Sequence, residues 1–348
     1  MNSKFKFLAL AIFMIFFNLQ TKASSVLLPM DDEGQQNHLK AYGITYWALA
    51  KSYKVNWLLN YRGGSFLLPD GDDIRKECQI RGVSFEVLTD GATAAILEEI
   101  SSPSQNMETV VLEKAPKIAV YTPKGKQPWD DAVTMVLTYA EIPYTEIYDE
   151  EVLSDQLVLY EWLHLHHEDF TGQYGKFFGN YRNAPWYIQQ KLDSEALAKK
   201  LGFNKVSEEK RAVATKIRDY VIGGGFMFAM CSATDSFDIA LSAESTDICE
   251  PMFDGDASEP NYQAKIDYTN TFAFKDYILE KQPMKYEFSD IDTTEEHGKG
   301  SFSMEVDYFT LMDFSAKWDP IPTMLCQNHT QIVKGFMGQT TAFAADKI

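Results

Sequence analysis

The residue with the clearest chemical potential is Cys231, at a predicted junction between a strand and a helix. Three glycines precede an apolar run at 226–230, which has the length of a buried strand. Ser232 and Asp235 then form the Ser-x-x-Asp pattern of a helix start, whose N–H groups stabilise a thiolate and can hold an oxyanion. The spacing predicts a nucleophile elbow with cysteine in place of serine. The alternative is a buried cysteine that packs as a small apolar side chain.

A histidine-rich segment supplies the proton carrier that such a cysteine would need. Half of the protein's six histidines lie at 164–167, directly after a strand predicted at 157–163. His166 or His167 would be the general base, with Glu168 as the carboxylate that orients it. Because the carboxyl ends of parallel strands meet at one edge of a sheet, we expect this segment close to Cys231. The alternative is a polar loop whose histidines bond to backbone and water.

The same segment also admits a metal site. His164 and His166 point to the same face if the strand continues, and imidazole is a common zinc ligand. No compact third ligand is visible, and the four cysteines have none of the spacings of a zinc site. We therefore expect no metal and no cofactor, and we keep a metal-dependent hydrolase centred on these two histidines as an alternative.

The elements that must position these residues alternate between strand and helix. Predicted strands lie at 55–59, 65–68, 83–88, 108–112, 117–121, 143–147, 157–163 and 226–230. Predicted helices lie at 38–53, 74–81, 92–100, 129–140, 189–201 and 207–222, with another from Ser232. This rhythm predicts a three-layer α/β fold with a mostly parallel, doubly wound sheet at 115–348, preceded by an N-terminal α/β region at 24–114. Residues 24–36 are expected to be a mobile lead-in.

Residues 1–23 predict a signal peptide. Lys4 and Lys6 precede an almost wholly apolar stretch at 7–19, and Thr21 and Ala23 form a small-x-small cleavage site. The stretch is too short for a membrane span, and no later segment is long and apolar enough for one. We expect a periplasmic or secreted protein, with an uncleaved N-terminal anchor as the alternative.

Charge and cysteine content narrow the possible partners. The formal net charge is −18, which argues against nucleic acid and anionic membranes. Export permits disulfides, and a bond between Cys231 and Cys249 would disable the proposed nucleophile. A small-molecule substrate fits this composition, and the oligomeric state is left open.

Four segments carry a resemblance to a known family. They are LNYRGGSF at 59–66, QPWDDA at 127–132, WLHLHHEDFTGQY at 162–174, and the elbow at 223–244. Together they resemble exported Bacteroidetes proteins labelled asparagine synthetase B, whose α/β part is similar to class I glutamine amidotransferases. The resemblance implies that fold for 115–348 and implies that Cys231 is the nucleophile. Ala229 and Ala233 stand where that fold usually has glycines.

Two departures bear on the reaction that the resemblance implies. The family's catalytic His-x-Glu has no match, because neither His297 nor His329 is followed by that pattern, and the relatives continue into a further His- and Gly-rich segment. A C-terminally truncated copy is therefore one interpretation. The N-terminal cysteine and the Ser-Gly-Gly-x-Asp-Ser loop of glutamine-dependent asparagine synthesis are also missing. We expect the fold rather than the labelled reaction.

Three functions follow from these patterns. The first is an exported amidotransferase-like protein, a Cys-dependent amidase or amidotransferase that uses Cys231, His166, His167 and Glu168. The second is a non-catalytic binding module, in which the histidine-rich loop and the aromatic segment at 177–187 form a cleft. The third is the metal-dependent hydrolase.

Overall fold

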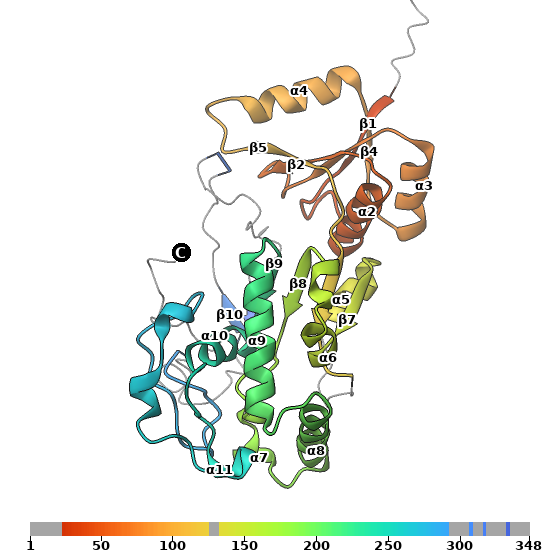
Figure 1. Cartoon of the computed structure of the whole chain (residues 1–348). Helices are drawn as coiled ribbons and strands as arrows, with labels where there is room; N and C mark the ends of the chain where they lie inside the picture. The colour runs from red at the N-terminus through yellow and green to blue at the C-terminus, as the bar shows by residue number, and fades with distance from the viewer. Residues whose placement is uncertain (1–22, 125–131, 292–305, 309–315, 318–331, 335–348) are drawn as a thin grey trace, which may run out of the picture. The chain divides into compact units, whose positions relative to one another are not determined.

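The computed structural model describes residues 23–124, 132–291, 306–308, 316–317 and 332–334 (Figure 1). The chain divides into two compact units. One comprises 1–115 with 139–142 and 310–331, and the other comprises 116–138, 143–309 and 332–348. No helix within the described ranges has both the length and the apolar character needed to cross a bilayer.

The first unit contains a five-stranded antiparallel sheet in the order β4-β1-β3-β2-β5. Its strands are β1 (Ala23–Leu28), β2 (Val55–Leu59), β3 (Phe66–Pro69), β4 (Glu86–Thr89) and β5 (Glu108–Leu112). Its helices are α2 (His38–Ala50), α3 (Asp72–Arg81) and α4 (Asp90–Ser101). The side chains of α2 and α3 pack on one face of the sheet and those of α4 on the other. The α/β character predicted for 24–114 is therefore present, with antiparallel pairing.

The prediction of a mobile lead-in at 24–36 is wrong. Strand β1 lies inside the sheet, between β3 and β4. Val26 and Leu28 enter the core on the α2 side, whereas Leu27 enters the core on the α4 side. Both faces of the strand are covered, so its short apolar run lacks the polar alternation that would mark a strand.

The second unit contains a four-stranded parallel sheet in the order β7-β6-β8-β9. The strands are β6 (Ile118–Tyr121), β7 (Tyr144–Ile147), β8 (Trp162–Leu165) and β9 (Phe226–Ala229). The chain runs from β6 to β7 on one side and then crosses back to β8 and β9 on the other. The direction of winding therefore reverses between β6 and β8, which makes that point the topological switch point of the sheet. Parallel pairing was correctly predicted for this sheet.

Seven helices of the described residues lie along the connections that follow β6. They are α5 (Ala132–Ala140), α6 (Asp149–Leu153), α7 (Phe178–Tyr181), α8 (Pro185–Lys200), α9 (Val206–Ile222), α10 (Ser232–Ser242) and α11 (Pro251–Asp254). The short 3-10 turns are η1 (Gln156–Leu159), η2 (Tyr174–Lys176), η3 (Tyr262–Lys265) and η4 (Tyr268–Asn270), and β10 (Val306–Tyr308) pairs with β11 (Ile332–Lys334). Apolar side chains of α9 and α10, such as Ile217 and Phe237, pack with Leu163 of β8.

The strand predicted at 157–163 begins later than expected. Residues 156–159 form η1, and β8 starts at Trp162. Leu157 is nevertheless buried in the same core as Leu163. The turn residues and the strand residues are both apolar because both are buried. The sequence pattern therefore predicts one continuous strand where the structure has a turn followed by a strand.

Candidate functional site

Cys231 occupies a strained backbone position between β9 and α10. Its φ is 53° and its ψ is −144°, a left-handed conformation that residues with a side chain rarely adopt. Strand β9 ends two residues before it, and α10 begins immediately after it. This is the backbone that a nucleophile elbow requires, because the sharp turn exposes the side chain at the edge of the sheet. Cys231 is indeed an exposed residue.

The histidine-rich loop is fixed to the first turns of α10. The Ser232 hydroxyl donates to the His167 carbonyl at 2.9 Å, and the Ser236 hydroxyl donates to the Glu168 carbonyl at 2.9 Å. The Ala233 N–H donates to the His166 carbonyl at 3.4 Å. The structure therefore brings together the two segments in which the sequence predicted catalytic residues.

Within the loop, the two imidazoles lie against each other. Nδ1 of His167 is 3.0 Å from Nδ1 of His166, so one of these nitrogens donates and the other accepts. Glu168 is buried, and its Oε2 accepts a hydrogen bond from the main-chain N–H of His166 at 2.9 Å. The carboxylate thus holds the backbone from which both imidazoles project.

The electrostatic setting of Cys231 favours the thiol form. Although the residue as a whole is exposed, neighbouring protein atoms desolvate the thiol and raise its pKa above the ordinary value, and the nearby carboxylates of Asp235 and Glu168 raise it further. Hydrogen bonding from Ser232 acts in the opposite direction without reversing the shift. The thiol therefore needs a proton acceptor before it can act as a nucleophile near neutral pH.

The cysteines of the described segments are not paired. Cys78, Cys231 and Cys249 are free, and the Cys249 thiol donates to the Thr171 carbonyl at 3.3 Å. The disulfide that would have disabled Cys231 is therefore not formed. Cys326 and the histidines at 297 and 329 lie outside the described residues.

The two histidines of the metal alternative have different surroundings. His164 is buried in β8 with its ring stacked on Phe228 at 5.3 Å, whereas the His166 ring packs against His167 at 4.7 Å. In the part of the chain that the structure describes, the grouping with metal-ligand geometry contains neither and consists of Asp247, Cys249 and Asp254.

That grouping already has a cation within it. Lys205 Nζ lies 2.6 Å from Asp247 and 3.3 Å from Asp254. An ammonium group in this position neutralises the carboxylates that a metal ion would need. The side chains that are present therefore favour an ion-pair cluster over a metal site.

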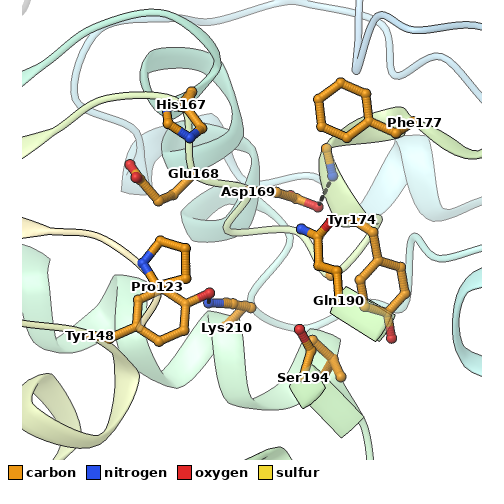
Figure 2. Close-up of a pocket in the computed structure, with 13 residues that line it drawn as sticks. Pro123, Tyr148, His167, Glu168, Asp169, Tyr174, Phe177, Gln190, Ser194 and Lys210 are labelled. Atoms are coloured by element: carbon orange, nitrogen blue, oxygen red, sulfur yellow. Dashed lines mark hydrogen bonds between the residues drawn. The ribbon is translucent and has the colours of Figure 1, made fainter. Parts of the chain in front are cut away.

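A cavity opens at the switch point of the parallel sheet. Pro123, which follows β6, and His167, which follows β8, both line it, and Lys210 of α9 lines it from beneath (Figure 2). A second cavity shares part of the lining and extends outward along α6 and α8. The inner part has a volume of about 40 Å³ and the outer part about 250 Å³. We call the two together the switch-point cleft.

A buried polar network forms the floor of this cleft. Lys210 Nζ lies 2.7 and 2.9 Å from the two carboxylate oxygens of Asp149, and it donates to the hydroxyls of Tyr121 and Tyr148 at 3.0 Å each. Burial alone lowers the pKa of Lys210, but the attraction of Asp149 outweighs it, so that pKa is raised. Lys210 is thus a charged but fully satisfied group.

Glu209 lies beside this network and is completely buried. Burial raises its pKa to about 8, and the neighbouring Asp149 contributes to the rise while Lys210 opposes it. As a carboxylate it has no hydrogen-bond donor among the described residues, but in its protonated form it can donate to Asp149. The surroundings of Glu209 therefore favour its protonated, neutral form.

One wall of the cleft has an unusual backbone. Tyr174, Gly175 and Lys176 have φ values of 52°, 68° and 58°, three left-handed residues in succession. Asp169 Oδ2 accepts a hydrogen bond from the Gly175 N–H at 3.0 Å, and the buried Lys176 Nζ donates to the Glu280 carbonyl at 3.0 Å. Backbone strain of this kind persists only where surrounding contacts impose it, and it is concentrated at functional sites.

The histidine-rich loop and the aromatic segment at 177–187 were predicted to form a cleft, but the polar groups that α8 and α9 contribute to it were not predicted. One signal for Lys210 was available, because it falls on the apolar stripe of α9 with Val206, Val213 and Ile217. A charged residue on such a stripe needs a buried partner. Nothing comparable marks Gln190 or Ser194, which face the cleft from a helix without a clear apolar side.

No protein-family model matches this chain, and neither a curated protein nor a solved structure matches it. The resemblance to the proteins labelled asparagine synthetase B therefore stays a prediction.

Proposed function

We propose that this is an exported, class I glutamine-amidotransferase-like protein in which Cys231 attacks the carbonyl carbon of an amide. The observation that carries the proposal is the backbone of Cys231, whose left-handed φ of 53° joins a parallel strand directly to a helix. The reversal of winding in the four-stranded sheet supports the doubly wound part of the fold.

The chemistry follows from the neighbours of the cysteine. An imidazole of His166 or His167 takes the thiol proton, and the sulfur forms a bond to the substrate carbonyl carbon. The oxyanion is stabilised by the main-chain N–H of Ser232, the first residue of α10. The tetrahedral intermediate then expels the amine, which receives the proton from the imidazole. Water hydrolyses the resulting thioester and regenerates the thiol.

Replacing the nucleophile tests this proposal. We expect Cys231→Ala to abolish ammonia release from carboxamides. We expect Cys231→Ser to reduce it strongly, because a hydroxyl is a weaker nucleophile than a thiol near neutral pH. Cys78→Ala is the matched control, since that thiol is free and lies in the other unit. Turnover that is unchanged in Cys231→Ala would end the nucleophile hypothesis.

The switch-point cleft favours a second candidate, a ligand-binding module. Its lining combines His167 and Glu168 of the histidine-rich loop with Phe177 of the aromatic segment. Ligands of open α/β sheets bind at switch points of this kind. In this case Cys231→Ala would bind the ligand as tightly as the unaltered protein.

A further inference from the structure

We propose that the switch-point cleft binds a small organic amine in its ammonium form. This inference rests on the second candidate function, because it presumes that the cleft holds a ligand, and it adds the chemical class of that ligand. Three features of the lining carry it: an excess of carboxylates, two carboxylates that have no lysine or arginine at ion-pair distance among the described residues, and a buried acceptor that has no donor among them.

The lining of the cleft is acidic. Among the described residues it contains five carboxylates and two lysines. The carboxylates are Glu150, Glu151, Glu168, Asp169 and Asp193, and the lysines are Lys124 and Lys210. Lys210 offers little to an anion, since four oxygens already surround its ammonium group. A cleft with this balance of charge attracts cations and repels phosphates and carboxylates.

Ion pairs account for only part of this acidity. Glu150 pairs with Lys200 at 2.8 Å, and Glu151 pairs with Lys124 at 2.5 Å. Within the described ranges, no lysine or arginine lies at ion-pair distance from Asp169 or Asp193. In the described part of the chain, Asp169 accepts from the Thr171 N–H and hydroxyl and from the Gly175 N–H, and Asp193 accepts from the Gln189 amide at 2.8 Å. The buried ammonium group of Lys176 attracts Asp169 from beyond ion-pair distance and compensates part of its charge, whereas the charge of Asp193 stays available to a cation.

Gln190 supplies a neutral acceptor at the centre of the cleft. Its Oε1 is buried and has no hydrogen-bond partner in the described part of the chain. The residue lines both the inner and the outer cavity, and Figure 2 shows its amide group extending toward Asp169. A buried acceptor without a donor is unfavourable, and a ligand N–H would satisfy it. An ammonium group placed between Gln190 and Asp169 would satisfy both.

Size and shape restrict the amine. The inner cavity of about 40 Å³ holds one head group, and the outer cavity of about 250 Å³ holds a short chain. These volumes lie below those of drug-sized sites. Asp193 lines the outer cavity, where it could receive a second ammonium group. A short aliphatic diamine fits this arrangement best.

Calorimetric titration of the full chain with three matched four-carbon probes tests the inference. We expect 1,4-diaminobutane to bind at pH 7, and we expect 1,4-butanediol and succinate to bind at least about tenfold more weakly. Gln190→Leu should weaken diamine binding by about tenfold, because the ligand N–H then lacks its acceptor. Gln190→Glu should tighten it by a similar factor through the added charge. Asp219→Asn, an exposed change near the end of α9, should leave the affinity unchanged.

The outcomes separate the inference from the function on which it rests. Tighter binding of succinate or butanediol than of the diamine would overturn the amine assignment and retain a ligand-binding cleft. If none of the three probes binds, the amine proposal is refuted. If a library of small polar compounds then also gives no measurable binding, the binding function itself is refuted. If both Gln190 variants bind the diamine with the affinity of the unaltered protein, the amine binds elsewhere and this site is refuted.

Discussion

Replacing Glu209 with glutamine should remove the part of the pH dependence of stability that Glu209 contributes between about pH 5 and 8. Glu209 is buried beside Asp149 and Lys210, and its pKa in the folded protein is raised to about 8 from an ordinary value of 4.5. Below pH 4.5 the group is protonated in both the folded and the unfolded state, so its contribution to stability is fully present. Between 4.5 and 8 only the folded state holds the proton, and stability falls as the pH rises.

The magnitude follows from the two pKa values. Each pH unit in this interval costs about 1.4 kcal/mol of unfolding free energy, so the full interval corresponds to about 5 kcal/mol. At pH 7 the unaltered protein has lost about 3 kcal/mol of this. The amide of Glu209→Gln keeps a donor for Asp149 and has no proton to lose. The variant should therefore be more stable at pH 7 by up to about 3 kcal/mol, and equally stable at pH 4.5.

Urea unfolding monitored by circular dichroism at intervals from pH 4.5 to 8.5 measures this directly. Asp219→Asn is the matched control, because it removes a carboxylate from the same helix at an exposed position and should leave the slope with pH unchanged. The reasoning is refuted if Glu209→Gln keeps the slope of the unaltered protein, or if it lowers stability throughout the range.

Three further predictions concern the same unit. Lys210→Met should destabilise the fold by about 3–5 kcal/mol, measured by urea unfolding, because Asp149 is left buried without its cation; a neutral effect would show that the network is dispensable. Glu168→Gln should speed alkylation of Cys231 at pH 8 a few-fold, since a carboxylate that raises the thiol pKa is removed; slower alkylation would contradict this. Gly172→Ala should reduce the thermal midpoint sharply, because φ is 83° and the added Cβ would lie 2.7 Å from the backbone of α9; an unchanged midpoint would show that the loop can move away.

Local sequence signals were sufficient to predict the part of the fold that holds Cys231, at the edge of the parallel sheet. The glycine break and the apolar run place Cys231 between β9 and α10, and the structure agrees. The capping pattern was wrong in detail, because Cys231 and not Ser232 is the N-cap of α10, and the Ser232 hydroxyl donates to the His167 carbonyl. The proximity of the histidine-rich loop also followed from parallel pairing. Such signals are reliable where connections are short and glycine marks the ends of the elements, because each signal depends only on residues adjacent in the chain.

The remaining features depend on contacts between distant segments. β1 reads as a lead-in because its strand character is decided by β3 and β4, which lie far along the chain. The left-handed run at 174–176 has no sequence signal, since tyrosine and lysine normally avoid that conformation. The cleft gathers side chains from several elements, and only the fold shows that they meet.

The most direct test of the account is to trap the covalent intermediate on Cys231. The protein is incubated with γ-glutamyl p-nitroanilide, an activated amide, quenched with acid and mapped by peptide mass spectrometry. We expect an acyl group on the peptide that contains Cys231, removable by neutral hydroxylamine as a thioester and missing in Cys231→Ala. An acyl group found on Cys78 or Cys249 instead, or no adduct on any cysteine during measurable turnover, would contradict the assignment of Cys231 as the nucleophile.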